Sequence, residues 1–231
     1  MLDLNPYSAI RLSLAVGALT VALGAPTALS LGWLLARKSF PGKALLSTLI
    51  QAPLVLPPVV TGLLLLSWLG KNGLLGRVFS WFGLSIPFSF AGCVAAGLTM
   101  GLPLFVMSAR TVFESIDPRY EEVSATLGRP PWLTFFRISL PLALPGLAAG
   151  AVLSFMRALG EFGATAVLAG NMEGKTRTIS LAVYTLLEMP GCREQPRILI
   201  LASILLSFAA LFGYEYLLRI QRLRLGLPHG S

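Results

Sequence analysis

The stretch DPRYEEVSATLGRPPWLTFFRISLP, residues 117–141, is a polar island in an otherwise apolar chain. Asp117 is placed to cap a helix that starts at Pro118, and Gly128 is placed to end it about ten residues later. The two prolines that follow prevent this helix from continuing. A second short helix is expected from Trp132 to Pro141, where a long apolar run begins. The segment therefore predicts a helix-turn-helix that lies outside a bilayer.

The first of these helices has the features of a docking surface. Tyr120, Val123 and Leu127 fall on one helical face, and Ser124 and Ala125 are small enough for another backbone to approach closely. Loops between membrane helices are usually polar, so a loop without a partner is the alternative on composition alone. We expect the segment to bind a partner protein through this face.

The composition places the chain in a membrane. It has 231 residues, of which 55% are hydrophobic and 12% are charged, and its mean hydropathy is +0.76. These values are too apolar for a soluble domain. The net charge of +8 could indicate nucleic acid, but the Lys and Arg residues are scattered between apolar runs rather than gathered on one face. We expect basic loops beside membrane helices and no nucleic-acid partner.

The apolar runs predict an all-α membrane protein with a single domain, residues 1–231, because about 20 residues cross a hydrocarbon core. The five predicted spans are residues 9–36, 44–69, 88–109, 142–169 and 198–218, with residues 110–141 as the loop between the third and fourth. Two shorter helices are expected outside the core, an interfacial one at about 74–82 and an amphipathic or re-entrant one at about 179–187.

The orientation follows from the odd number of spans and the basic loops. A small excess of Lys and Arg favours an N-terminus outside and a C-terminus in the cytoplasm, with Cys192 on the outer side. A six-span arrangement would place the C-terminal tail outside instead.

Two features of the spans could belong to a pathway. Pro53, Pro57 and Pro58 break the second span, which is tolerated only where protein or water satisfies the freed carbonyls. A kink used only for packing is the alternative. In the fourth span, Gly146 and Gly150 have the GxxxG spacing that favours a close helix contact.

Arg157 and Glu161 are the only charged residues well inside a predicted span, and their spacing of four residues allows an ion pair. One reading is a gate at residues 160–165 with Gly160 and Gly163 as hinges; the other is a structural pair near the headgroups. Thr61 and Thr165 place small hydroxyls in the second and fourth spans, where they could line such a pathway.

The chain lacks the motifs of an energy-transducing enzyme. Residues 170–176 include Gly170, Gly174, Lys175 and Thr176 and look like a phosphate-binding loop, but three residues separate the glycines where four are needed. No metal-ligand or nucleophile pattern occurs either, so no catalytic residue and no cofactor is expected in this chain. Energy must come from another subunit or from an ion gradient.

The polar segment also resembles a known family. Its spacing matches the E-A-A-x3-G-x9-I-x-L-P loop of ABC importer permeases at Glu122, Gly128, Ile138, Leu140 and Pro141, with Val123 and Ser124 in place of two alanines. Three further stretches, FPGK at 40–43, PLVLPPVV at 53–60 and GEFGAT at 160–165, are similar to the molybdate permease subunits of that family.

The resemblance implies a type I ABC importer permease in the bacterial inner membrane. Two copies would form the pathway, two cytoplasmic ATPase subunits would carry ATP and Mg²⁺, and a periplasmic molybdate-binding protein would deliver the ion. The coupling residues would be Tyr120, Glu122, Ala125, Gly128, Ile138 and Pro141. The pathway and gate residues would be Pro57, Pro58, Thr61, Arg157, Gly160, Glu161, Gly163 and Thr165.

Several alternatives stay open from the sequence. Tungstate, sulfate or another oxyanion could be the cargo of the same kind of importer. A gradient-driven secondary transporter would be a different class, but inverted repeats and a relay of buried carboxylates are not found. A membrane scaffold without transport would leave the broken second span unexplained.

Overall fold

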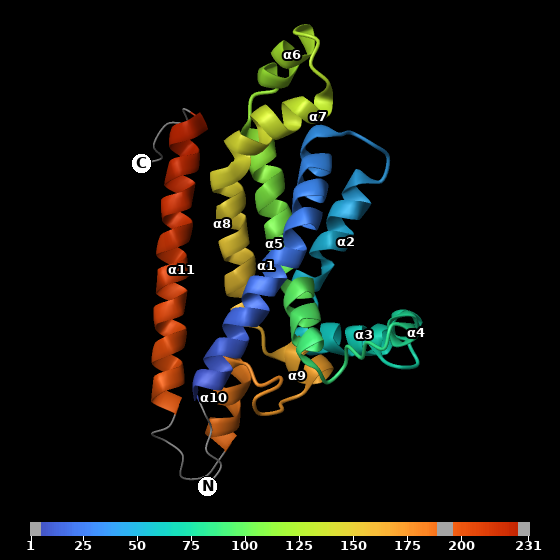
Figure 1. Ribbon diagram of the computed structural model, residues 1–231, viewed down its shortest axis with the longest axis vertical. Helices are drawn as coiled ribbons and strands as arrows, with labels where there is room; N and C mark the ends of the chain where they lie inside the picture. Colours follow the sequence, from blue (N-terminus) through green and yellow to red (C-terminus); the bar gives the residue numbers. More distant parts are fainter. Residues whose placement is uncertain (1–5, 189–195, 226–231) are drawn as a thin grey trace.

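A computed structural model describes residues 6–188 and 196–225 of the chain, and these residues form helices and connecting loops without any strand (Figure 1). The helices are α1 Pro6–Arg37, α2 Lys43–Val55, α3 Pro58–Leu69, α4 Leu74–Trp81, α5 Phe90–Ser115, α6 Arg119–Thr126, α7 Pro131–Thr134, the π-helix η1 Phe135–Ser139, α8 Leu140–Leu159, α9 Gly163–Ala169, α10 Ile179–Glu188 and α11 Pro196–Leu225. The predicted all-α class is confirmed for the described residues.

Four long apolar stretches of the described chain can cross a membrane as single helices. They are α1, α5, the continuous stretch Pro131–Leu159 and Arg197–Leu225 of α11. The predicted second span, 44–69, is instead two helices, α2 and α3, with an angle of 113° between them. The break falls at Leu56 and Pro57, because the prolines at 57 and 58 cannot donate to the preceding turn. The number of crossings is therefore four, or five if the bent pair counts as one.

The core of the bundle is formed by α1, α5 and α8, which pack closely through small residues. A Cβ added to Gly146 would collide with Val112 of α5, and one added to Gly150 would lie 2.7 Å from the Ser108 Oγ. The close helix contact that the GxxxG spacing predicts is confirmed. It lies within one chain, between α8 and α5.

Helix α11 is attached to this core along one side only. The Gln221 side chain is buried, and its Oε1 accepts a hydrogen bond from the Gly146 N–H at 3.0 Å. Arg224 donates to the Pro141 carbonyl at 3.2 Å. The opposite side of α11 exposes large apolar side chains, including Leu205 and Phe212, as expected for a surface that meets lipid.

The two ends of the bundle differ in structure. At one end lie α6, α7 and the last turns of α11; at the other lie α9, α10 and the start of α1 (Figure 1). The Ile179 N–H of α10 donates to the Ser13 Oγ of α1 at 2.8 Å. Helix α10 has ten residues and is too short to cross a bilayer, as predicted. Cys192 lies outside the described residues.

Candidate functional site

The polar segment forms the capped helix that its sequence predicts. The Asp117 Oδ1 accepts a hydrogen bond from the Arg119 N–H at 2.9 Å, and α6 runs from Arg119 to Thr126. Gly128 has a φ of 73°, a left-handed conformation that a residue with a Cβ adopts only with strain. The helix begins one residue later than predicted, with Pro118 at the N-cap.

The predicted second short helix is not a separate element. Helix α7 passes through η1 into α8, so the start of the fourth long helix is Pro131. The Leu140 N–H bonds to the Phe135 carbonyl, five residues back, in a π-turn. This wider turn precedes Pro141, which has no N–H to donate, so the chain stays helical where the sequence predicted a stop. Thus α6 is the one independent helix of the segment.

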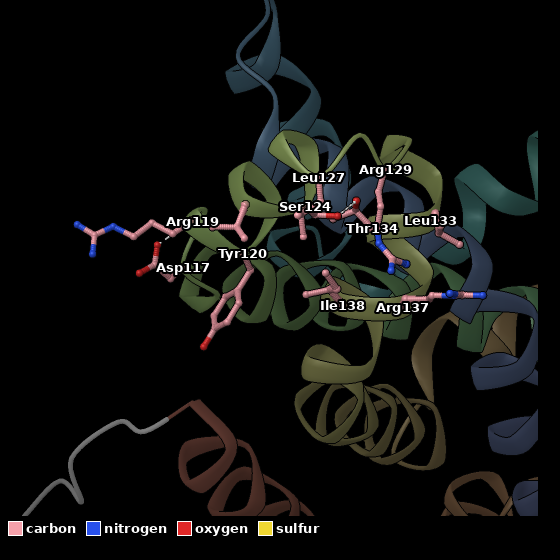
Figure 2. Close-up of a pocket in the computed structure, with 11 residues that line it drawn as sticks. Asp117, Arg119, Tyr120, Ser124, Leu127, Arg129, Leu133, Thr134, Arg137 and Ile138 are labelled. Atoms are coloured by element: carbon pink, nitrogen blue, oxygen red, sulfur yellow. Dashed lines mark hydrogen bonds between the residues drawn. The ribbon is translucent and has the colours of Figure 1, made fainter.

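The face of α6 that we predicted to bind a partner protein borders an open hollow. The hollow has a volume of about 660 Å³ and is lined by residues of α6, α7, η1 and the turns on either side of α6: Asp117, Arg119, Tyr120, Val123, Ser124, Leu127, Arg129, Leu133, Thr134, Arg137 and Ile138 (Figure 2). Tyr120 is 53% exposed and Leu127 is 72% exposed. Exposed large apolar side chains with Arg and Asp side chains beside them form a surface suited to contact with another protein.

Ser124 has a different role from the one predicted. It is buried, and its hydroxyl lies 2.7 Å from the hydroxyl of Thr134, so its small size lets α6 approach α7 of the same chain. Ala125 and Glu122 are exposed and remain accessible to a partner. Ile138 and Pro141 are half-buried; Ile138 lines the hollow, whereas Pro141 lies in the first turn of α8.

A second glutamate, which the sequence reading missed, anchors α6 to the bundle. Glu121 forms an ion pair with Arg37 at the end of α1, with 3.1 Å between the Arg37 Nε and the Glu121 Oε1. The Ser139 hydroxyl donates to the same Oε1 at 3.0 Å, and Arg37 also donates to the Ile116 carbonyl at 3.0 Å. Glu121 and Glu122 are adjacent and chemically identical, so the sequence does not show which of them pairs with Arg37. Only the fold distinguishes the two.

At the other end of the bundle, the predicted pair of Arg157 and Glu161 is present. The two side chains are joined by a 2.5 Å ion pair, and the Glu161 Oε1 accepts from the Ala164 N–H at 2.9 Å. The predicted fourth span to residue 169 is wrong, because α8 ends at Leu159 and Glu161 lies in the break before α9. Glu161, only 2% exposed, therefore holds both sides of this break.

Helix α9 packs directly on α3. A Cβ added to Gly163 would lie 2.8 Å from the Pro58 Cβ, so the glycine permits this approach. Thr61 and Thr165 are both buried, and Thr61 donates to the Pro57 carbonyl at 3.4 Å. Gly163, predicted as a hinge of the gate, lies against α3 of the same chain. Of the residues predicted for the pathway and gate, Pro57, Pro58 and Gly160 are exposed.

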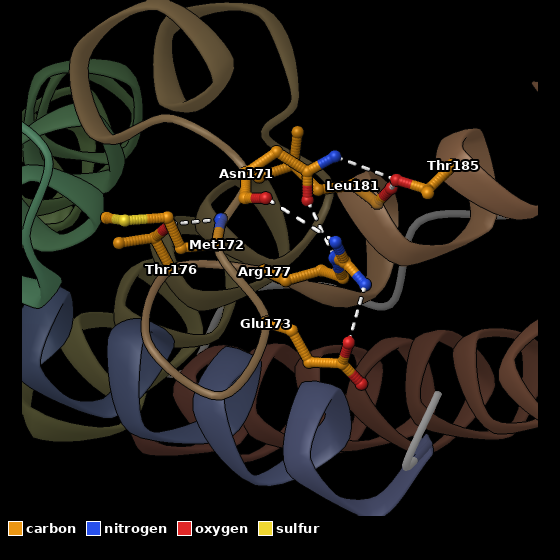
Figure 3. A network of polar contacts seen from close by, with 7 residues as sticks. All are labelled: Asn171, Met172, Glu173, Thr176, Arg177, Leu181 and Thr185. Atoms are coloured by element: carbon orange, nitrogen blue, oxygen red, sulfur yellow. Dashed lines mark hydrogen bonds and ion pairs between the residues drawn. The ribbon is translucent and has the colours of Figure 1, made fainter. Parts of the chain in front are cut away.

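The segment between α9 and α10 is a braced loop rather than a phosphate cradle (Figure 3). The Thr176 hydroxyl accepts from the Met172 N–H at 2.9 Å and donates to the Gly170 carbonyl at 3.3 Å. Arg177 donates to the Asn171 Oδ1 at 2.9 Å and pairs with Glu173 at 3.3 Å. Residues 171–175 are exposed at the tip of this loop. The described residues also contain no group of three or more side chains that could hold a metal ion.

Together, long apolar helices, a broken helix pair and an exposed hollow on a capped polar helix define an integral membrane permease subunit. The chain belongs to the family of binding-protein-dependent transport system inner membrane components, which matches residues 28–224.

Similar proteins support this membership, and a solved structure shows the same fold. The molybdenum transport system permease protein of Escherichia coli (strain K12) is 45% identical over 221 residues, which cover 95% of this chain and 96% of that protein. The Haemophilus influenzae counterpart is 46% identical over 220 residues, which cover 95% and 96%. A bacterial alginate ABC transporter in complex with its periplasmic protein has the same fold, with a TM-score of 0.70 over 94% of this chain and 79% of that chain at 18% identity.

Proposed function

We propose that the chain is the permease subunit of an ATP-driven importer for molybdate. The supporting observation is the 45% identity to molybdenum transport permeases along almost the whole length of both chains. The sulfate transport permease of Escherichia coli is 36% identical, and the match covers 78% of this chain and 66% of that protein. The likeness thus favours molybdate over sulfate, while tungstate, with the same shape and charge as molybdate, is an alternative cargo.

The hollow beside α6 is the docking site for a cytoplasmic ABC ATPase in this proposal. A protein partner would bury its exposed apolar side chains, and the Arg and Asp side chains beside them would orient that partner. Two copies of the chain bind two ATPase subunits, which carry ATP and Mg²⁺. The α6 end of the bundle is then cytoplasmic and the N-terminus is periplasmic. The membrane is the bacterial inner membrane.

The contact between α3 and α9 is the outer gate. Its support is the pair of breaks, one at Pro57 and one at Gly160–Phe162, which flank the close packing of Gly163 on Pro58. Breaks of this kind let short helices move as units against the rigid α1, α5 and α8 core. Glu161 fixes the hinge through Arg157 and α9.

The braced loop at residues 170–178 contacts a periplasmic binding protein. Its exposed tip is held by side-chain hydrogen bonds, so it is ordered before a partner arrives, and it lies at the end of the bundle opposite α6. An ordered loop loses little conformational freedom on binding, which favours association.

Copurification tests the docking site. The permease is coexpressed with its cognate ABC ATPase, and the ATPase retained per permease is measured after size exclusion. Leu127→Glu should reduce this amount strongly, because it places a charge at the centre of an apolar contact. Leu84→Glu, at an exposed residue outside the hollow, is the matched control. Equal retention of the ATPase by both variants would contradict the proposal.

A further inference from the structure

One face of the bundle carries polar side chains that none of the roles above uses. On α5, Met107, Arg110, Thr111 and Glu114 follow one another at helical spacing and so share a stripe. On α2, Ser47 and Gln51 lie one turn apart. With Leu35, Ile50 and Val106 these side chains line a hollow of about 150 Å³ between the two helices.

This hollow lies between two apolar helices, about one to two turns in from the α6 end of the bundle (Figure 1). Gln51 is eight residues into α2, a rise of about 12 Å from Lys43, and Arg110 is five residues before the end of α5, a rise of about 8 Å. Polar and charged groups at this depth face water or protein, because lipid cannot satisfy them. The exposed surface of α11 is apolar, and α2 also exposes Leu45 and Leu49, so the polar hollow interrupts an otherwise apolar surface. The face of α2 and α5 is therefore the side of the subunit that adjoins the pathway.

The groups around the hollow include hydrogen-bond donors, and the one positive charge among them is paired with a carboxylate. Arg110 pairs with Glu114 through its Nε at 2.8 Å, and a guanidinium has four further N–H donors for a ligand. The Gln51 amide donates to Ser47 at 3.0 Å on the Oγ and at 3.1 Å on the carbonyl, so an anion would take over one of these two hydrogen bonds. Because Glu114 carries the opposite charge beside Arg110, an anion would be attracted without being held tightly. The volume equals about five water molecules, which is enough for one tetrahedral oxyanion.

We propose that the hollow between α2 and α5 is an anion-binding site on the cytoplasmic half of the translocation pathway. Arg110 and Gln51 donate hydrogen bonds to a tetrahedral oxyanion as it leaves the membrane. Glu114 is a positioning residue that limits how firmly Arg110 holds the ion. The site rests on the proposed function, because it needs an oxyanion in the pathway.

The test measures binding and transport on the same complex. Permease and ATPase are purified together, equilibrium binding of radiolabelled molybdate is measured without the binding protein, and ATP-driven uptake is measured in vesicles with it. Arg110→Gln and Gln51→Leu should each weaken binding, by about tenfold for the charged donor, and slow uptake. Glu114→Gln should strengthen binding and also slow uptake, because release becomes harder.

The opposite changes in molybdate binding expected for Arg110→Gln and Glu114→Gln distinguish the proposed site from an ion pair with only a structural role. A structural pair loses the same contact in Arg110→Gln and Glu114→Gln, so both variants would then bind molybdate alike. Arg77→Gln removes an exposed charge from α4 and is the control that should leave both measurements unchanged. Gln51→Leu and Glu114→Gln keep the test decisive if Arg110→Gln fails to assemble with the ATPase.

The wild-type complex separates the two proposals. If it shows no ATP-driven molybdate uptake, the proposed function fails and the anion site falls with it. If the wild type transports molybdate and the Arg110 and Gln51 variants bind and transport it equally well, only the anion site is refuted. A shared direction of change in molybdate binding by the Arg110 and Glu114 variants would likewise refute it and leave a contact between subunits as the role of this face.

Discussion

Replacing Glu161 by Ala removes two interactions at the break between α8 and α9. The buried Ala164 N–H loses its acceptor, which costs about 1–3 kcal/mol. Arg157 loses its ion pair, but its side chain is 28% exposed and reaches water, so we expect about 1–2 kcal/mol instead of the 3–5 kcal/mol of a fully buried pair. The variant should be less stable by about 2–5 kcal/mol.

A double-mutant cycle with Arg157→Met isolates the ion pair. The unfolding free energy of the permease in detergent, followed by tryptophan fluorescence, should show a coupling of about 1–2 kcal/mol between the two positions. Glu173→Ala provides the control: it removes a glutamate that is 34% exposed and pairs with Arg177 at 3.3 Å, and it should cost less than about 1 kcal/mol. If the losses from Glu161→Ala and Arg157→Met add within about 0.5 kcal/mol, the two side chains do not interact and the reasoning is refuted.

Three further predictions concern coupling, the gate and topology. Gly128→Val should uncouple ATP hydrolysis from uptake while the membrane part stays folded, because valine cannot hold a φ of 73° without strain; normal uptake by this variant would count against it. Gly163→Leu should impair uptake, since its side chain would collide with Pro58, yet leave ATPase copurification intact, and unaltered uptake would remove the gate from α9. A membrane-impermeant thiol reagent should label Cys192 only from the periplasmic side and an Arg222→Cys variant only from the cytoplasm, and the reverse pattern would overturn the orientation.

The parts of this structure that could be predicted from sequence depend on local signals. Apolar runs located the four long helices of the described residues, although both ends of the fourth were wrong, because length and hydropathy alone decide what can cross a bilayer. The capped helix α6 followed from Asp117 and Gly128, whose effects act over a single turn. The pair of Arg157 and Glu161 followed from a spacing of four residues.

The parts that could not be predicted depend on contacts between distant segments. The prolines at 57 and 58 indicate a break, but its 113° angle is set by the packing of α3 on Gly163, over a hundred residues away. The choice of Glu121 over Glu122 as the anchor depends on where Arg37 ends α1. The polar hollow between α2 and α5 was missed because its residues come from helices sixty positions apart.

The central claim is that ATP hydrolysis by a separate subunit drives an oxyanion through this chain. The most direct measurement is uptake of radiolabelled molybdate into vesicles that contain the permease and its ATPase, with the binding protein added outside and ATP inside. We predict uptake that requires ATP and the binding protein, persists when ionophores collapse all ion gradients, and is competed by tungstate more strongly than by sulfate. Uptake that continues without ATP and stops when the gradients are collapsed would contradict the account and assign the chain to the gradient-driven carriers.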